Sequence, residues 1–308
     1  MYKTILFATT SSPLCNDASK VAFELARKYG SKLCIFHALG FPTRGFGPFV
    51  VDFKTGEHEY YSLEHIQEVK EEIERTYADG LEELDHYVID TWAGVPHVEI
   101  LRLARKEDAD LIIMGPHTRD EKGAQSYRSI VGSTMQGVSQ RARCPVMIVS
   151  RAVPKEKLEF ANILFGTDFS RASDVAFLFA YKVAKKLGAK LYLFHALDIV
   201  PSPGATIPGQ EEIEKRLEEV KEKIKDRYVS KMEGFDNYEI KTWEGIPYME
   251  IAKFERRKEA DLIVMAHHSK AMDPEEALLG STLEQVVVRG GCPVVSVNHP
   301  ERISEPKG

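Results

Sequence analysis

The chain of 308 residues lacks the features that mark membrane, secreted and metal-binding proteins. No apolar run approaches the ~20 residues that a membrane-spanning helix needs, so we expect no membrane partner. The chain begins Met1-Tyr2-Lys3 and continues into apolar residues without the charged leader and cleavage site of a signal peptide, which predicts a cytoplasmic protein. Its four cysteines include no CxxC pair, so we expect neither a metal site nor dithiol chemistry.

The chain also lacks an excess of positive charge and the common catalytic motifs. The formal net charge is −6, from 41 basic and 47 acidic residues, which argues against a broad basic face for nucleic acid. The sequence contains no Gly-x-Ser-x-Gly, no GxxxxGK[ST] and no His-Glu-x-x-His motif. We therefore expect no efficient enzyme and name no catalytic residue. Apolar residues make up 43% of the chain, which is a normal globular proportion.

The chain is an internal duplication. Residues 5–39 align with 163–197 at an offset of 158 without a gap, and sixteen of the 35 pairs are identical. The match resumes at an offset of 151, where Thr-Trp-Ala-Gly-Val-Pro at 91–96 corresponds to Thr-Trp-Glu-Gly-Ile-Pro at 242–247. A third block, at an offset of 148, carries Gly-Ser-Thr and Cys-Pro-Val in both halves. Two small length changes separate the halves, and we expect both in loops.

Each half predicts strands that alternate with helices. Short buried strands are expected in the first half at 4–9, 32–38, 88–92, 111–114 and 146–149. Apolar stripes predict helices over 18–29 and 62–85, with a counterpart of the latter at 210–232, and Pro96 opens a further helix. Strands separated by helices pair in parallel through right-handed crossovers. The sequence therefore predicts two doubly wound α/β domains, each with a five-stranded parallel sheet.

The repeat also predicts the domain boundaries. We expect one domain over 1–150 and a second over 160–300. A polar linker with Pro154 is expected over 151–159, and a polar tail over 301–308. Each half has its own set of strands and helices, so each domain is expected to build its own core.

Ligands of open parallel sheets bind beyond the carboxyl ends of the strands, where the strand order reverses. Three segments of each half meet this description: the exits of the first and second strands, and the loop after the fourth strand. That loop ends in Gly-Ser-Thr at the start of a helix, where free N–H groups and hydroxyls favour a phosphate. The candidate binding residues are Ala8, Thr9, Thr10, Ala38, Met114, Gly115, Gly132, Ser133 and Thr134 in the first half, and Gly166, Thr167, Asp168, Ala196, Met265, Ala266, Gly280, Ser281 and Thr282 in the second.

These motifs resemble the universal stress protein family in its tandem form. The resemblance covers nearly the whole chain and rests on Ile-Leu-Phe-Gly-Thr-Asp-Phe-Ser at 163–170, the Gly-x-Pro before a helix, the Leu-Ile-x-Met strand and the Gly-Ser-Thr loop before Cys-Pro-Val. It implies a Rossmann-like fold of the adenine nucleotide α-hydrolase type. It also implies a pseudo-dimer in which 146–149 pairs with 294–297. Separately, we expect two chains to associate further into a homodimer, with the aromatic segment 41–61 as the candidate contact.

Members of the family that bind ATP carry Gly-x-x-Gly, then nine residues, then Gly-Ser or Gly-Thr, so the resemblance implies ATP binding where this pattern is present. Neither half of this chain keeps the pattern. In the first half, Thr118 replaces the second glycine, thirteen residues follow, and Thr10 replaces the family's strand Asp, which contacts adenosine in ATP binders. The second half keeps Asp168, but Ala266 and Ser269 replace the glycines and ten residues follow. Thr118 and Ser269 join the candidate residues, and Asp168 favours the second half.

Plainer interpretations of the same residues stay open. Asp168 is either a nucleoside contact or the N-cap of the next helix. The Gly-Ser-Thr segments are either phosphate contacts or simple helix starts. His117 and His268 occupy equivalent loop positions without converging ligands, so polarity of the loop is the default. The aromatic segment 41–61 has no counterpart in the second half, and it either packs on its neighbours or forms an interface.

Three functional hypotheses follow from the resemblance and from these departures. The leading one is a cytosolic stress-response protein that binds ATP or AMP, with Mg²⁺ present only if ATP is bound. This protein would act as a sensor or regulator with little or no hydrolysis. The alternative is a nucleotide-free scaffold with two degenerate sites, whose surface binds partners. The third is a weak ATP-cleaving enzyme.

Overall fold

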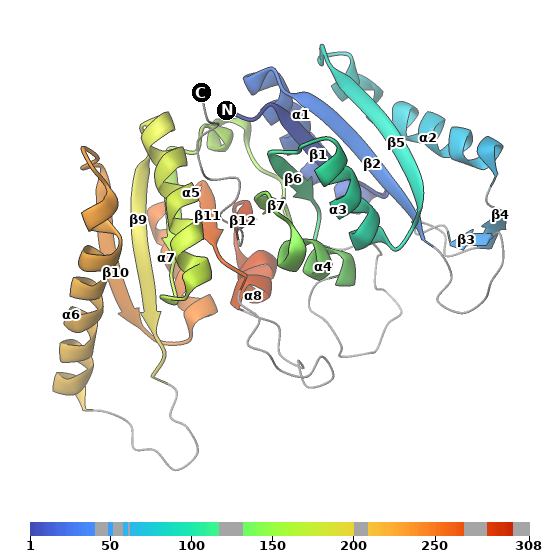
Figure 1. Ribbon diagram of the computed structural model, residues 1–308. Coiled ribbons are helices and arrows are strands. Elements are labelled where there is room, and N and C mark those ends of the chain that lie inside the picture. The colour runs from blue at the N-terminus through green and yellow to red at the C-terminus, as the bar shows by residue number, and fades with distance from the viewer. Residues whose placement is uncertain are drawn as a thin grey trace. The chain divides into compact units, whose positions relative to one another are not determined.

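The computed structural model describes residues 1–40, 49–51, 58–60, 62–116, 132–199, 209–267 and 282–297 (Figure 1). The chain divides into two compact units, Met1–Leu158 and Glu159–Gly308. Several predicted features lie outside the described residues, namely the candidate residues Thr118, Ser269, Gly280 and Ser281, the histidines His117 and His268, and the tail 301–308. None of the helices in the described parts of the chain is long and apolar enough to cross a membrane.

The first unit contains a five-stranded parallel sheet in the order β5-β2-β1-β6-β7. Its strands are β1 (Thr4–Ala8), β2 (Lys32–Gly40), β5 (Tyr87–Gly94), β6 (Leu111–Met114) and β7 (Val146–Ile148). Its helices are α1 (Asn16–Tyr29), α2 (Leu63–Leu81), α3 (Pro96–Lys106) and α4 (Ser133–Arg141), with short 3-10 turns η1 (Pro13–Cys15) and η2 (Lys155–Glu159). The reversal of strand order about β1 defines a doubly wound fold.

The second unit has the same topology, with the strand order β10-β9-β8-β11-β12. Its strands are β8 (Asn162–Gly166), β9 (Lys190–Leu197), β10 (Tyr238–Glu244), β11 (Leu262–Met265) and β12 (Val294–Ser296). Its helices are α5 (Arg171–Leu187), α6 (Gln210–Arg227), α7 (Pro247–Lys258) and α8 (Thr282–Arg289), with the 3-10 turn η3 (Val229–Lys231). Two doubly wound α/β domains with five-stranded parallel sheets, as the sequence predicts, are thereby confirmed. The pairing of 146–149 with 294–297 stays a prediction.

One hairpin in the first unit was not predicted. Strand β3 (Phe49–Val51) pairs antiparallel with the end of β2 at Gly40 and with β4 (His58–Tyr60). Both strands belong to the aromatic segment 41–61, in which no strand was expected. The described residues of the second unit contain no counterpart of this hairpin. Each of the two strands has only three residues, which is too short to show a period of two, so the sequence pattern missed the hairpin.

Aromatic side chains fill both faces of each sheet. In the first unit, Phe7 of β1 packs edge-on against Phe23 of α1 and Tyr77 of α2. On the opposite face, Phe36 of β2 contacts Trp92 of β5. Successive strand residues point to opposite faces, so α1 and α2 cover one face, and α3 and α4 the other (Figure 1). The second unit repeats these clusters with Phe165, Phe177 and Tyr228 on one face and Phe194, Trp243 and Phe254 on the other.

Element boundaries differ from the expected ones by a few residues. Strand β2 continues to Gly40, so Ala38 lies inside the strand and not at its exit. Helix α6 ends at Arg227, where the sequence analysis expected a helix to residue 232. In the linker, Leu158 is buried and its carbonyl accepts a hydrogen bond from Lys28 Nζ of α1, so this part of the linker packs on the first unit.

Left-handed residues end several helices. Gly188 ends α5 at φ 67°, and open space surrounds the place where a Cβ would lie. Glu259 ends α7 in the same conformation, at φ 50°, although it carries a side chain. A left-handed backbone costs a residue with a Cβ about 1 kcal/mol more than it costs glycine.

We expect Gly188→Ala to lower the free energy of unfolding by about 1 kcal/mol, because only the backbone conformation opposes the added methyl group. We expect Glu259→Gly to raise this free energy by a few tenths of a kcal/mol or more, since it relieves the same strain. Urea denaturation followed by circular dichroism measures both changes. Equal urea midpoints for Gly188→Ala and the parent chain would contradict the left-handed conformation of Gly188.

Candidate functional site

In the second unit, the exits of β8 and β11 meet where the strand order reverses. Strand β8 lies between β9 and β11, and the chain leaves it through Gly166 and Thr167. A Cβ on Gly166 would lie 4.0 Å from the Cβ of Met265, the last residue of β11, so the two exits are in contact. Asp168 and Ala266 follow directly on these exits. The structure therefore brings the candidate residues of the first and fourth strands together at the switch point.

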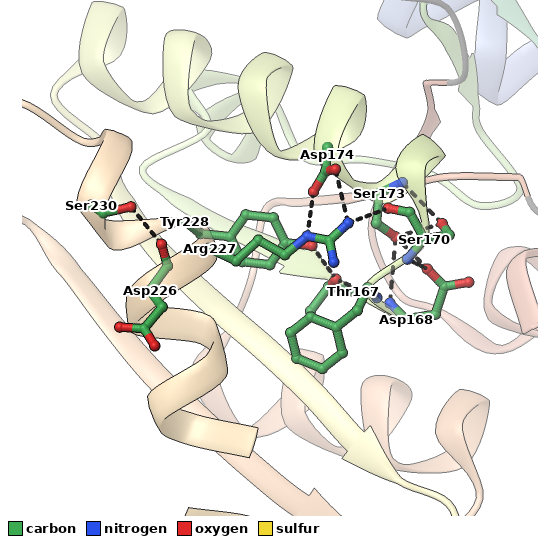
Figure 2. Close-up of polar contacts among 10 residues, drawn as sticks. Thr167, Asp168, Ser170, Ser173, Asp174, Asp226, Arg227, Tyr228 and Ser230 are labelled. Atoms are coloured by element: carbon green, nitrogen blue, oxygen red, sulfur yellow. Dashed lines mark hydrogen bonds and ion pairs between the residues drawn. The ribbon is translucent and has the colours of Figure 1, made fainter. Parts of the chain in front are cut away.

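Asp168 is exposed, and hydrogen bonds to its own turn hold it in place (Figure 2). Its Oδ1 atom accepts hydrogen bonds from the backbone N–H of Ser170 at 2.9 Å and from the Ser173 hydroxyl at 2.6 Å. The N-cap of α5 is Ser170, whose hydroxyl accepts from the N–H of Ser173 at 3.1 Å. The interpretation of Asp168 as the N-cap is therefore wrong. Its carboxylate instead closes an Asx turn onto the residue two positions ahead.

A buried polar frame lies beneath this turn. The Thr167 and Tyr228 hydroxyls are 2.7 Å apart, and burial raises the pKa of Tyr228 to about 12. His195 Nδ1 lies 2.8 Å from the Thr167 carbonyl oxygen, which can only accept, so Nδ1 carries the proton. Burial lowers the pKa of His195, and the ammonium of Lys223 lowers it further, whereas the Thr167 bond and the Asp168 carboxylate raise it. His195 is thus held as a neutral donor.

Phe169, between Asp168 and Ser170, adopts a left-handed backbone with φ 60°. Its ring centroid lies 4.8 Å from that of His195, and the Lys223 ammonium lies 4.2 Å from the ring centroid. Such contacts offset the strain of a left-handed residue that has a side chain. The turn that carries Asp168 is therefore held from the side of α6.

The first unit keeps the frame and changes the turn. Thr9 Oγ1 lies 2.6 Å from the Tyr77 hydroxyl, and His37 Nδ1 lies 2.9 Å from the Thr9 carbonyl oxygen. Thr10, at the position of Asp168, lies 3.5 Å from the thiol of Cys15, which takes the place of Ser173. The carboxylate–hydroxyl pair of the second unit is thus a hydroxyl–thiol pair in the first. Sequence reasoning missed Cys15, Ser173 and the two tyrosines, although alignment of the repeats places each beside its counterpart.

Most candidate residues of the first unit line one small cleft. Seven of them form its wall together with Cys15, Phe36, Pro96 and Ile100. They come from the exits of β1 and β6, from within β2 and from the start of α4, and are Ala8, Thr9, Thr10, Ala38, Met114, Gly115 and Thr134. The cleft has a volume of about 30 Å³, room for about two water molecules. Small-molecule pockets are about ten times larger. The cleft as it stands does not admit a nucleotide base.

The Gly-Ser-Thr segment of the first unit starts α4 as expected. Gly132 is the N-cap, its N–H donates to the Pro116 carbonyl, and Ser133 is the first helical residue. No side chain caps this helix start. In the second unit α8 begins at Thr282, the last residue of the equivalent segment. The described residues contain no group of three or more His, Cys, Asp or Glu side chains that could hold a metal.

Two doubly wound units, each with a polar turn at its switch point, place the chain among proteins of Rossmann-like architecture. The chain belongs to the universal stress protein family, since the model of the Universal stress protein family matches residues 1–150 and 159–298. The tandem form that the resemblance implies is thereby confirmed.

Some relatives match nearly the whole chain and others match about half of it. A universal stress protein of Mycolicibacterium smegmatis is 24% identical over 305 residues, which cover 95% of this chain and 96% of the relative. Universal stress protein MJ0531 of Methanocaldococcus jannaschii is 35% identical over 164 residues, covering 51% of this chain and 86% of the relative. The crystal structure of a universal stress protein from Archaeoglobus fulgidus aligns with a TM-score of 0.67 at 22% identity over 97% of each chain, which shows the shared fold.

The pKa of His195 tests the geometry of the second site. Asp168→Asn removes a carboxylate that raises this pKa, so we expect the pKa to fall further below its ordinary value. Lys223→Met removes a cation that lowers it, so we expect the pKa to rise toward the ordinary value. Imidazole NMR shifts followed against pH measure both changes, with His195→Gln to assign the signal. If both variants changed the pKa of His195 in the same direction, the placement of Asp168 and Lys223 beside His195 would be contradicted.

Proposed function

We propose that the second unit binds an adenine nucleotide at the carboxyl edge of its sheet. The observation that carries this proposal is the Asp168 carboxylate, exposed at the switch point and oriented by two hydrogen bonds to one of its oxygens. A carboxylate held there can accept hydrogen bonds from ribose hydroxyls or from the amino group of adenine. Because Ser170 and Ser173 orient it before the ligand arrives, little ordering entropy opposes binding.

The phosphates of this ligand are proposed to lie at the start of α8. Its backbone N–H groups and the Thr282 hydroxyl are the donors that an anion at a helix N-terminus requires. Ser269, Gly280 and Ser281 remain predicted contacts from the preceding loop. The wall beneath the nucleoside would consist of the remaining candidate residues of this unit, namely Gly166, Thr167, Ala196, Met265 and Ala266. Mg²⁺ would enter only together with ATP.

We assign no nucleotide to the first unit as it stands. Thr10 cannot offer a charged acceptor, and the cleft that it lines holds about 30 Å³. The chain would then act as a nucleotide-responsive regulator with one ligand per chain and little or no hydrolysis, in line with its lack of hydrolytic motifs. A cytoplasmic location and self-association of two chains stay predictions.

Titration calorimetry with AMP and with ATP tests the site. We expect Asp168→Asn to weaken binding by about 10-fold to 100-fold, because a hydrogen bond to a charged group contributes about 1.5–3 kcal/mol. The asparagine keeps an oxygen for Ser170 and Ser173, so the turn should persist. The matched control is Thr10→Ala at the equivalent position of the first unit, for which we expect an unchanged dissociation constant.

Mass spectrometry of small molecules released from the denatured protein complements the titration. Stoichiometric adenine nucleotide in the parent chain, lost in Asp168→Asn, would support the proposal. Protein that carries no nucleotide and fails to titrate at millimolar AMP or ATP would overturn it and favour the nucleotide-free scaffold. Equal weakening by Thr10→Ala and Asp168→Asn would contradict the assignment to the second unit.

A further inference from the structure

Arg227, the last residue of α6, binds the β8–α5 turn through its planar guanidinium (Figure 2). Its Nε atom donates to Asp174 Oδ1 at 2.7 Å, and one terminal nitrogen donates to Asp174 Oδ2 at 2.8 Å. The same terminal nitrogen lies 3.4 Å from the carbonyl oxygen of Ser170. This is the two-point arginine–carboxylate geometry, in which both the distance and the orientation of the partners are fixed.

A continuous set of bonds leads from this guanidinium to Asp168. The backbone carbonyl of Ser170 faces Arg227, and the backbone N–H of Ser170 donates to Asp168 Oδ1 at 2.9 Å. Asp174 stands one residue after Ser173, whose hydroxyl is the other donor to Asp168 Oδ1. Both donors that orient the Asp168 carboxylate are therefore adjacent to groups that Arg227 holds.

The β8–α5 turn contains a strained residue, which contacts from outside the turn stabilise. Phe169 is left-handed at φ 60°, a conformation that a residue with a side chain keeps only when its surroundings enforce it. Helix α6 supplies two of the enforcing groups, Lys223 over the Phe169 ring and Arg227 on the turn itself. The neighbouring Tyr228 binds Thr167 on the other side of Asp168.

The first unit offers an internal comparison. Ser11 takes the same left-handed conformation there, at φ 55°, and the Tyr77–Thr9 bond is kept. However, Thr76 stands at the position of Arg227 and Asn16 at that of Asp174, at the offsets of 151 and 158. The guanidinium–carboxylate pair thus occurs in the unit that retains Asp168 and is replaced in the unit that lost it.

We infer that Arg227 is a positioning residue for the nucleotide site: by holding Ser170 and Asp174, it fixes the Asp168 carboxylate in the orientation that receives the nucleoside. This inference rests on the function proposed above. In the first unit neither side chain of this pair is present, since Thr76 and Asn16 stand at its two positions.

Titration with AMP tests the inference on the full chain. We expect Arg227→Gln to weaken AMP binding about 10-fold, an effect typical of residues that orient a ligand group from behind. Arg227→Lys should fall between the parent and Arg227→Gln, because an ammonium keeps the charge but not the two-point geometry. The control is Arg216→Gln, on the same helix, where the guanidinium pairs with exposed Glu212; its AMP affinity should equal that of the parent.

A double-mutant cycle separates positioning from general damage to the fold. In the Asp168→Asn background, where the charged acceptor is gone, we expect Arg227→Gln to have no further effect on AMP binding. Amide hydrogen exchange of residues 169–173 gives a second signal in the ligand-free protein. We expect Arg227→Gln to speed exchange there and to leave the first unit's turn at residues 11–15 unchanged.

The outcomes distinguish this inference from the proposed function. If the parent chain binds AMP and Arg227→Gln binds it equally well, the positioning role is overturned and the nucleotide site stands. If Arg227→Gln weakens binding equally with and without the Asp168 carboxylate, the effect is structural and the inference is also overturned. If the parent chain binds no nucleotide, both the site and the positioning role are overturned.

Discussion

Each unit buries one hydroxyl pair that joins the exit of its first strand to a tyrosine in, or directly after, its second helix, and the geometry of the site depends on this pair. Thr9 meets Tyr77 in the first unit, and Thr167 meets Tyr228 in the second, at 2.6 and 2.7 Å. A histidine donates to the carbonyl of the same threonine in both units. Most buried polar groups in proteins are paired, and these bonds hold the side chain and the carbonyl of Thr9 and of Thr167 at the strand exits. The turn that follows contains a left-handed residue in both units.

On this shared frame the two units diverge in the polar groups that face the switch point. The second has a carboxylate oriented by a hydroxyl and an amide, and an arginine that holds the turn. The first has threonine and cysteine at the corresponding positions, and a cleft too small for a nucleotide base. In the function that we propose, the second unit binds the ligand and the first keeps the same fold without it. The frame beneath these groups, a threonine, a tyrosine and a histidine, is the same in both units.

The sequence predicted the strands, the helices and the segments that meet at the switch point, since these follow from apolar periodicity and from the topology of parallel sheets. It did not predict how Asp168 is used. Both interpretations of Asp168, nucleoside contact and N-cap, were compatible with one carboxylate before a helix, and Ser170 proved to be the cap. The hairpin of β3 and β4 was missed as well, because strands of three residues carry no detectable period.

The sequence by itself determined the duplicated α/β architecture, the end of α1 at Tyr29 and the position of the candidate site, because each depends on local patterns or on the order of elements. Tertiary structure alone decided the volume of the first unit's cleft and the partners of Arg227 and Tyr228. The partners of Arg227 and Tyr228 lie more than fifty residues away in the chain. Side-chain packing sets such contacts, and its energy depends on distances that no local pattern encodes.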